Sequence, residues 1–450
     1  MPAAHPELLD LAARVADRAG PGEQVEAYVA RGVSTSVKAY DGEVESLTQA
    51  TSAGIGVRVI VDHREGFAYA GTLDEGAVLE ALAEARDNAA FGEPDEFNGL
   101  ATPDGVEPAV LDLWPERLAA VPTADKVKMA LELEAATRGR DARISGVRVA
   151  MFSDSLGEGA VATSTGIRAW GRAGTSYLMV QALAQQGDET QIASGLSVGR
   201  EVTDLSIDEA ADDAVLRATR LLGSTKPATQ RLTLVLEPRM SATILGIVGG
   251  MLSGEAVLKG RSPFADRAGE MVASPLLTFV DDPTDARSLG AETHDGEGLA
   301  CRRNELVVDG VLQGFLHNAY TGRRSGGAST GSAQRGIAST PGVGAGALVV
   351  APGTGTHAEV VAAIEHGLFV TSMAGLHSGV NPVSGDFSVG IEGLMVRDGA
   401  LAEPIREATI ASTIQRLLLD ISAVGDDLEW LPDGSGGVTL VIPDIALSGI

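Results

Sequence analysis

The stretch Gly54-Ile55-Gly56-Val57-Arg58-Val59-Ile60-Val61 alternates apolar side chains with small or polar ones over most of its length. This period of two is typical of a strand with one buried face. A polar turn at residues 62–66 separates it from the strand-like residues 66–69, and Asp41-Gly42 upstream is a hairpin signal. Segments 25–29 and 37–39 also have strand character. The sequence therefore predicts an antiparallel meander near the N-terminus.

Helical patterns flank this meander. Apolar residues from Leu8 to Ala16 recur at helical spacing, and Gly20-Pro21-Gly22 ends that helix. Further helices are expected over residues 73–90, 123–137 and 207–222.

Part of the strand pattern near the N-terminus recurs later in the chain. Ser164-Thr165-Gly166-Ile167-Arg168-Ala169 is similar to residues 52–57, and each stretch follows a strand-like run and precedes further strands and a helix. Either a duplicated sheet-and-helix unit or two similar hairpins that arose by chance would produce this pattern.

A polar linker at residues 224–228 precedes the apolar strand 232–236. We place a domain boundary there and expect an N-terminal domain over 1–225 and a C-terminal domain over 226–450. The predicted fold class is α+β. The first domain is expected to contain antiparallel sheets with flanking helices, and the second a mixed and antiparallel sheet with helices.

Glycine is dense between residues 326 and 346. A strand at 347–350 and a helix at 358–365 follow directly, so this tract is predicted to be packed rather than to be a flexible linker. Gly326-Gly327-Ala328-Ser329-Thr330-Gly331 within it lacks the G-x-S-x-G form of a nucleophile elbow and has no evident histidine partner.

Composition excludes several classes of function. The chain has 61 acidic and 34 basic residues and a net charge of −27, so nucleic-acid binding is not expected. A single cysteine excludes a disulfide framework and fits the cytoplasm. Residues 1–10 do not have the pattern of a signal peptide, and no stretch is expected to span a membrane.

Leu245-Gly246-Ile247-Val248-Gly249-Gly250 lies in a predicted helix whose apolar face is formed by Ala242, Leu245, Val248 and Leu252. With its continuation through Lys259-Gly260-Arg261-Ser262, this segment resembles the TldD/TldE (PmbA) family. Further ordered similarities lie in the C-terminal half, at residues 306–316, 321–324, 329–333, 366–371, 384–388 and 395–399.

The peptidase subunit of that family carries a His-Glu-x-x-x-His helix. If Lys259-Gly260 and Ser262 match the family residues after that helix, the two histidines fall on Leu245 and Gly250, and the glutamate falls on Gly246. Alkyl groups and hydrogen atoms neither bind zinc nor deprotonate its water. The chain is therefore most similar to the TldE/PmbA-type subunit, which lacks the metal site.

The resemblance also implies a late cysteine ligand after the segment 424–428, but the only cysteine is Cys301, well upstream. No catalytic or metal-binding residue is therefore expected in this chain. The resemblance implies a heterodimer with a metal-bearing TldD-type subunit, which would hold a zinc-type divalent ion. The pair would enclose the active site and admit unfolded or short peptides.

A peptide groove is expected at Gly385, Asp386, Phe387 and Ser388, with His317 as a further candidate. An extended peptide can pair with a strand edge, and glycine permits a close approach. A structural turn is the alternative, because Asp is common in turns and caps.

Two other interpretations stay open. His294, His317 and His377, together with Cys301, Asp295 or Asp386, would be needed for a replacement metal site, but no two of the histidines have helical ligand spacing. Without a catalytic partner, the chain would be a self-associating peptide-binding protein, with a homodimer as one form, or a peptidase with an unconventional site.

Overall fold

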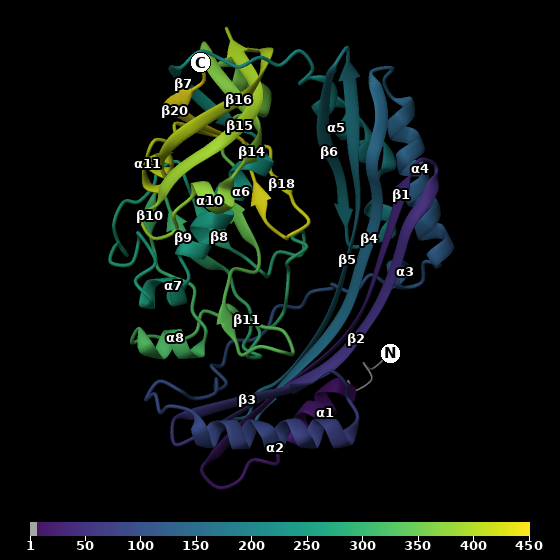
Figure 1. Ribbon diagram of the computed structural model, residues 1–450. Helices are drawn as coiled ribbons and strands as arrows, with labels where there is room; N and C mark the ends of the chain where they lie inside the picture. Colours follow the sequence, from purple (N-terminus) through teal and green to yellow (C-terminus); the bar gives the residue numbers. More distant parts are fainter. Residues whose placement is uncertain (1–6) are drawn as a thin grey trace.

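The computed structural model describes residues 7–450 (Figure 1). Residues 1–6, part of the segment in which no signal peptide is expected, lie outside the described residues. One antiparallel sheet, in the order β3-β2-β1-β4-β5-β6, dominates the first half of the chain. Its strands are β1 Glu23–Tyr40, β2 Glu43–Val61, β3 Arg64–Ala70, β4 Ile144–Thr163, β5 Arg168–Gln186 and β6 Glu189–Gly199.

The predicted meander is confirmed, with one difference. Segments 25–29 and 37–39 belong to the single 18-residue strand β1, because residues 30–36 keep pairing with β2 on one side and β4 on the other. The polar and small side chains in between obscured the strand pattern. A strand held by neighbours on both edges tolerates such residues.

Helices cover the outer face of this curved sheet (Figure 1). Apolar side chains of β1 and β2 pack on α1 and α2, and those of β4 and β5 pack on α4 and α5. The helices in this half are α1 Glu7–Ala16, α2 Glu75–Phe91, α3 Glu116–Ala119, α4 Thr123–Gly139 and α5 Ile207–Thr219, with the 3₁₀ turn η1 Val202–Asp204.

The element order shows a topological duplication. A helix, three antiparallel strands and a second helix occur as α1-β1-β2-β3-α2 and again as α4-β4-β5-β6-α5. Gly66 in β3 and Gly195 in β6 occupy matching places, since a Cβ at either would overlap the backbone of the helix that follows. The similar stretches 52–57 and 164–169 are not equivalent, because the first lies within β2 and the second spans the β4–β5 turn.

The second half of the chain contains two six-stranded sheets around one core. The sheet with the longer strands is mixed, because β7 and β14 run parallel and the other pairs are antiparallel. It has the order β16-β15-β14-β7-β20-β17, with β7 Gln230–Leu236, β14 His366–Ala374, β15 Asp386–Arg397, β16 Ala400–Thr413, β17 Ala423–Val424 and β20 Leu440–Ser448.

The smaller sheet has short strands in the order β10-β9-β8-β13-β19-β18. They are β8 Phe279–Asp281, β9 Asn304–Val308, β10 Val311–Leu312, β13 Leu348–Val350, β18 Glu429–Trp430 and β19 Gly436–Gly437. Side chains of α6 Pro238–Met251 belong to the core cluster that both sheets share. The predicted α+β fold class, with an antiparallel first half and a mixed second half, is confirmed.

The glycine-rich tract 326–346 contains the strand pair β11 Ala333–Gln334 and β12 Gly342–Val343, which differs from a flexible linker, although most of its residues are exposed or half-buried. Short helices complete this half: α7 Gly254–Leu258, α8 Ala319–Arg324, α9 His357–Ala362, α10 Leu376–Gly379 and α11 Ile414–Leu419. The strands of the first six-stranded sheet all precede residue 225, and those of the other two six-stranded sheets all follow it. The two-domain prediction places the boundary at this residue. Across residues 7–450, none of the helices has the length and apolar character needed to cross a bilayer.

Candidate functional site

The predicted helix around Leu245 is confirmed as α6, and its apolar face packs in the core. Leu245 is 2% exposed, among apolar neighbours. Gly246 and Gly250 face open space, because a Cβ at either would meet nothing within 4 Å. These three positions offer one buried alkyl group and two hydrogen atoms, so they do not fit a hydrolytic metal ion.

Cys301 and the late segment 424–428 do not supply the missing ligand. Burial, together with the nearby carboxylates of Glu292 and Asp295, raises the pKa of the Cys301 thiol far above its usual value. In the late segment, Asp427 accepts hydrogen bonds from the Thr439 backbone N–H at 2.9 Å and from its hydroxyl at 2.6 Å. These groups hold a loop and are not arranged as a metal site.

The candidate groove at Gly385, Asp386, Phe387 and Ser388 lies at the start of β15. Phe387 is 1% exposed and packs in the core. One edge of this segment pairs with β16, and on the other side Val380 forms a bridge to Phe387. The turn before it is closed by the Gly385 N–H, which donates to the Asn381 carbonyl at 2.8 Å. This geometry favours the structural turn over an open groove.

The candidate histidines lie on three separate segments. His317 precedes α8 and its Nδ1 lies 3.2 Å from the Thr321 hydroxyl, whereas His377 is exposed on α10. His294 contacts the Thr293 hydroxyl through Nδ1 at 3.0 Å. Within the described part of the chain, no group of three or more His, Cys, Asp or Glu side chains is arranged to hold a metal ion.

The other candidate groups have structural partners. Asp295 accepts hydrogen bonds from three backbone N–H groups, and burial beside Glu297 nevertheless raises the pKa of its carboxyl to about 7. The Asp386 carboxylate accepts a hydrogen bond from the Ser384 hydroxyl at 2.7 Å. The Ser329 hydroxyl donates to the His317 backbone carbonyl at 3.1 Å and, among residues 7–450, contacts no histidine side chain.

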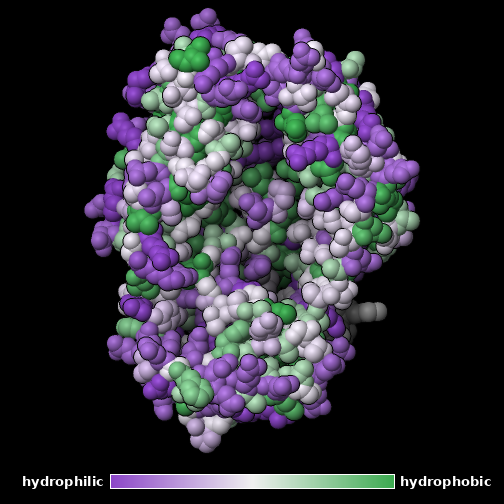
Figure 2. Space-filling view, in the orientation of Figure 1, coloured by the Kyte–Doolittle hydropathy of each residue, from purple (hydrophilic) through white to green (hydrophobic). Residues whose placement is uncertain are grey.

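The structure instead contains a cavity of about 600 Å³ between the inner face of the N-terminal sheet and loops of the second half. The space-filling view shows a deep hollow between these two parts (Figure 2). Its floor is formed by small residues on three neighbouring strands: Ala30 and Gly32 of β1, Gly157 and Gly159 of β4, and Gly171 and Ala173 of β5. Because these side chains are small, the sheet backbone is accessible from the cavity.

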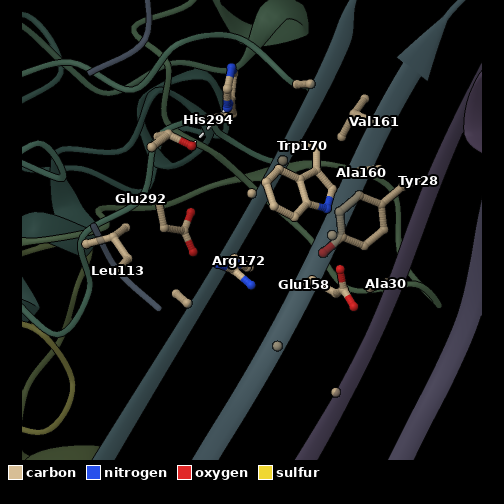
Figure 3. A pocket seen from close by; sticks show the side chains of 18 of the residues that line it. Tyr28, Ala30, Leu113, Glu158, Ala160, Val161, Trp170, Arg172, Glu292 and His294 are labelled. Carbon is tan, nitrogen blue, oxygen red and sulfur yellow. Dashed lines mark hydrogen bonds between the residues drawn. The ribbon is translucent and has the colours of Figure 1, made fainter. Parts of the chain in front are cut away.

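One wall of the cavity is the loop 291–296, which carries Glu292 and His294. In Figure 3 the Glu292 carboxylate points toward β5, the strand that carries Trp170 and Arg172. Glu292 is exposed toward the cavity, and desolvation by the surrounding walls, with a contribution from Asp281, raises the pKa of its carboxyl. Burial lowers the pKa of His294, which favours the neutral imidazole.

A buried ion network fixes the cavity walls to one another. Arg58 of β2 donates to Glu26 of β1 at 3.1 and 3.0 Å and to Glu297 at 3.1 Å. Arg335, which lines the cavity, pairs with the same Glu26. Burial alone would raise the pKa of Glu26, but the two guanidinium groups outweigh it and hold that pKa below its usual value. The network joins the N-terminal sheet to the loops of the second half.

None of the cavity residues was singled out from the sequence as a site except His294 and Asp295. The cavity residues come from segments as far apart as Tyr28 and Arg335, so no local motif unites them. The one available signal was glycine within strand patterns, at positions 157, 159 and 171, because glycine there often marks a close approach to the backbone.

Comparisons with known proteins agree with this architecture. Family models match three successive parts of the chain: PmbA/TldA metallopeptidase domain 1 at residues 25–89, the central domain at 116–222 and the C-terminal domain at 229–450.

Two curated relatives align along nearly the whole chain. Metalloprotease PmbA of Escherichia coli O157:H7 is 24% identical, over 96% of this chain and 93% of the relative. A metalloprotease PmbA homolog of Haemophilus influenzae is 26% identical, over 98% and 96%. The crystal structure of TldE from Thermococcus kodakarensis superposes with a TM-score of 0.87 at 22% identity, covering 95% of this chain and 97% of that one. This last similarity establishes the fold.

Proposed function

Because the chain belongs to the PmbA/TldA metallopeptidase family, we propose that it is the subunit of a heterodimeric metallopeptidase that does not itself carry the catalytic metal. The observation that supports this proposal is the state of α6. Leu245 is committed to the core, and Gly246 and Gly250 have no side chain to coordinate an ion.

Amide hydrolysis by a zinc-type ion requires ligands for the ion and a base for its water. With neither at α6, the catalytic ion has to be held by another polypeptide, which we propose is a homologous TldD-type subunit. This chain would then contribute one half of the peptide chamber, and the cavity between its two halves provides a surface for that role. We place the pair in the cytoplasm, where a single buried cysteine stays reduced.

Reconstitution tests the proposal. We expect the purified chain alone to leave an unstructured peptide intact, and a 1:1 complex with the metal-bearing homologue to cleave it until a chelator is added. A matched control is the same complex whose metal-bearing subunit has lost its ligand histidines. Chelator-sensitive cleavage by this chain alone would refute the proposal.

A second candidate, a self-associating peptide-binding protein, is favoured by the free edge of β2. Residues 43–53 pair with β1 on one side, whereas β3 pairs with β2 only from Ile55 onward. Val44 is 41% exposed and Leu47 is 48% exposed on this edge. Long exposed strand edges tend to pair with another chain. A stable homodimer that persists when the homologue is present, without peptidase activity, would favour this function.

A further inference from the structure

The cavity adjoins a strand edge that is open along part of its length. β5 pairs with β4 from Arg168 to Ala184, but β6 pairs with it only from Ser176 onward. The stretch 168–175 therefore has one neighbour in the sheet, and its other edge borders the cavity. This is a place where a further strand can be added.

The direction of the free backbone groups follows from one hydrogen bond. The N–H of Gly174 points away from β4, because it donates to the Leu113 carbonyl at 3.0 Å. Backbone groups alternate along an antiparallel strand, so those of Arg172 and Trp170 point to the same side. Among residues 7–450 no backbone partner pairs with these groups of Trp170 and Arg172.

The loop 102–112 passes this edge without filling it. It is attached where the Thr165 hydroxyl donates to the Ala101 carbonyl at 2.6 Å, where Asp104 forms an ion pair with Arg302 at 2.7 Å, and where Leu113 accepts from Gly174. Between these points the loop is largely exposed, and Val110 has no cover at all. An extended segment between the loop and β5 would therefore not need to displace packed side chains.

The charged residues that line the cavity indicate what kind of peptide segment would bind beside β5. Arg31, Glu158, Arg172 and Arg335 all have ion-pair partners, and Asp295 is held by backbone donors. Glu292 is the one charged lining residue, within the described chain, for which neither a hydrogen bond nor an ion pair involves the side chain. Glu292 is exposed toward the cavity, so a cationic group that enters the cavity can reach its carboxylate and form a charge-assisted contact there. The net charge of −27 also attracts cations to the molecule.

We propose that an extended peptide pairs with the β5 edge at Trp170 and Arg172 and places a cationic group, either a Lys or Arg side chain or a free amino terminus, against Glu292. The proposal rests on the peptide-processing role proposed above and adds the binding edge and the preferred charge. It requires no metal and no second subunit for binding, so it can be measured on this chain alone.

The test uses labelled ten-residue unstructured peptides that carry one central Lys, and matched peptides with Gln in its place, followed by fluorescence anisotropy. We expect the Lys peptide to bind the wild-type chain about tenfold more tightly, the size typical of one charge-assisted contact. Glu292→Gln should remove this difference. Glu365→Gln, which changes an exposed carboxylate in the bend before β14, should retain it.

Strand pairing is tested by N-methylation of alternate residues of the Lys peptide. One of the two alternating patterns should weaken binding strongly and the other should not, because only every second N–H of an added strand faces β5. Equal binding of both N-methylated peptides would overturn the strand pairing, and an unchanged Lys preference in Glu292→Gln would overturn the assigned contact. A matching unfolding curve for Glu292→Gln excludes a folding defect.

This outcome is separable from the test of the proposed function. If the chain alone shows the Lys preference and the reconstituted pair has no peptidase activity, the proposed function fails and the binding site stands. If the pair is active and the chain alone shows neither the Lys preference nor N-methyl sensitivity, the binding site fails by itself.

Discussion

Replacing Arg58 with Met should break the ion network that joins the two halves of the molecule. The guanidinium of Arg58 is 4% exposed and contacts carboxylates that are 0% and 1% exposed, those of Glu26 and Glu297. Methionine fills a similar volume and removes the charge. Glu26 keeps Arg335, but Glu297 is left with the backbone N–H of Ala319 as its remaining donor among these contacts.

The expected decrease in the free energy of unfolding follows because Glu297 stays buried with fewer donors. Removing one partner of a buried, hydrogen-bonded ion pair costs about 3–5 kcal/mol, since the remaining charge stays desolvated. Here Arg58 donates three hydrogen bonds to two buried carboxylates and a fourth, at 3.5 Å, to the more exposed Glu65, so we expect a loss of stability within that range. Because the network connects the N-terminal sheet to the second half, the two parts should also begin to unfold separately.

Urea unfolding, followed by far-UV circular dichroism and tryptophan fluorescence, measures the loss. Arg31→Met is the matched control, because Arg31 is 46% exposed and pairs with Glu158 at the surface. Arg31→Met should lower the free energy of unfolding by less than about 1 kcal/mol, and added salt should reduce this effect. The effect of Arg58→Met should change little with salt. A loss below about 1 kcal/mol for Arg58→Met would show that the network does not hold the two halves together.

Two further predictions concern packing and pH. Gly66→Ala should lower stability by about 1–3 kcal/mol, because its Cβ would overlap α2, and Gly246→Ala should raise it by up to about 1 kcal/mol, because its Cβ meets nothing. A stabilised Gly66→Ala or a destabilised Gly246→Ala in thermal unfolding would contradict this. Burial raises the pKa of Asp281 to about 6, above its unfolded value of about 3.9, so its contribution to stability is complete at low pH and is lost as pH rises from about 4 to 6. Asp281→Asn should lack this loss, and its stability relative to wild type should rise by up to about 3 kcal/mol between pH 4 and pH 7; a difference that does not change with pH would refute the assignment.

Much of the fold was predictable because its signals are local. The alternation in residues 54–61, the Asp41-Gly42 turn and the helical spacing from Leu8 to Ala16 each depend on residues close in the sequence, and each is confirmed. The strand β1 was predicted as two pieces, because its middle is held by hydrogen bonds to β2 and β4 rather than by its own side chains.

The site shows the opposite situation. Asp386 and Phe387 were expected in a groove, but the chain itself covers that edge through Val380. The floor of the cavity is formed by small residues on different strands, and Glu292, whose carboxylate has no ion-pair partner among the described residues, lies in a distant loop. No periodicity or motif in the sequence predicts that these distant segments lie together.

By itself, the sequence determined the fold class and the absence of ligand groups at Leu245, Gly246 and Gly250, since the chemistry of a side chain is fixed by its residue type. Only the tertiary structure decided which backbone groups of β5 stay free and which charge stays unpaired. Those properties depend on what every other part of the chain covers. They therefore exist only once the two halves have packed.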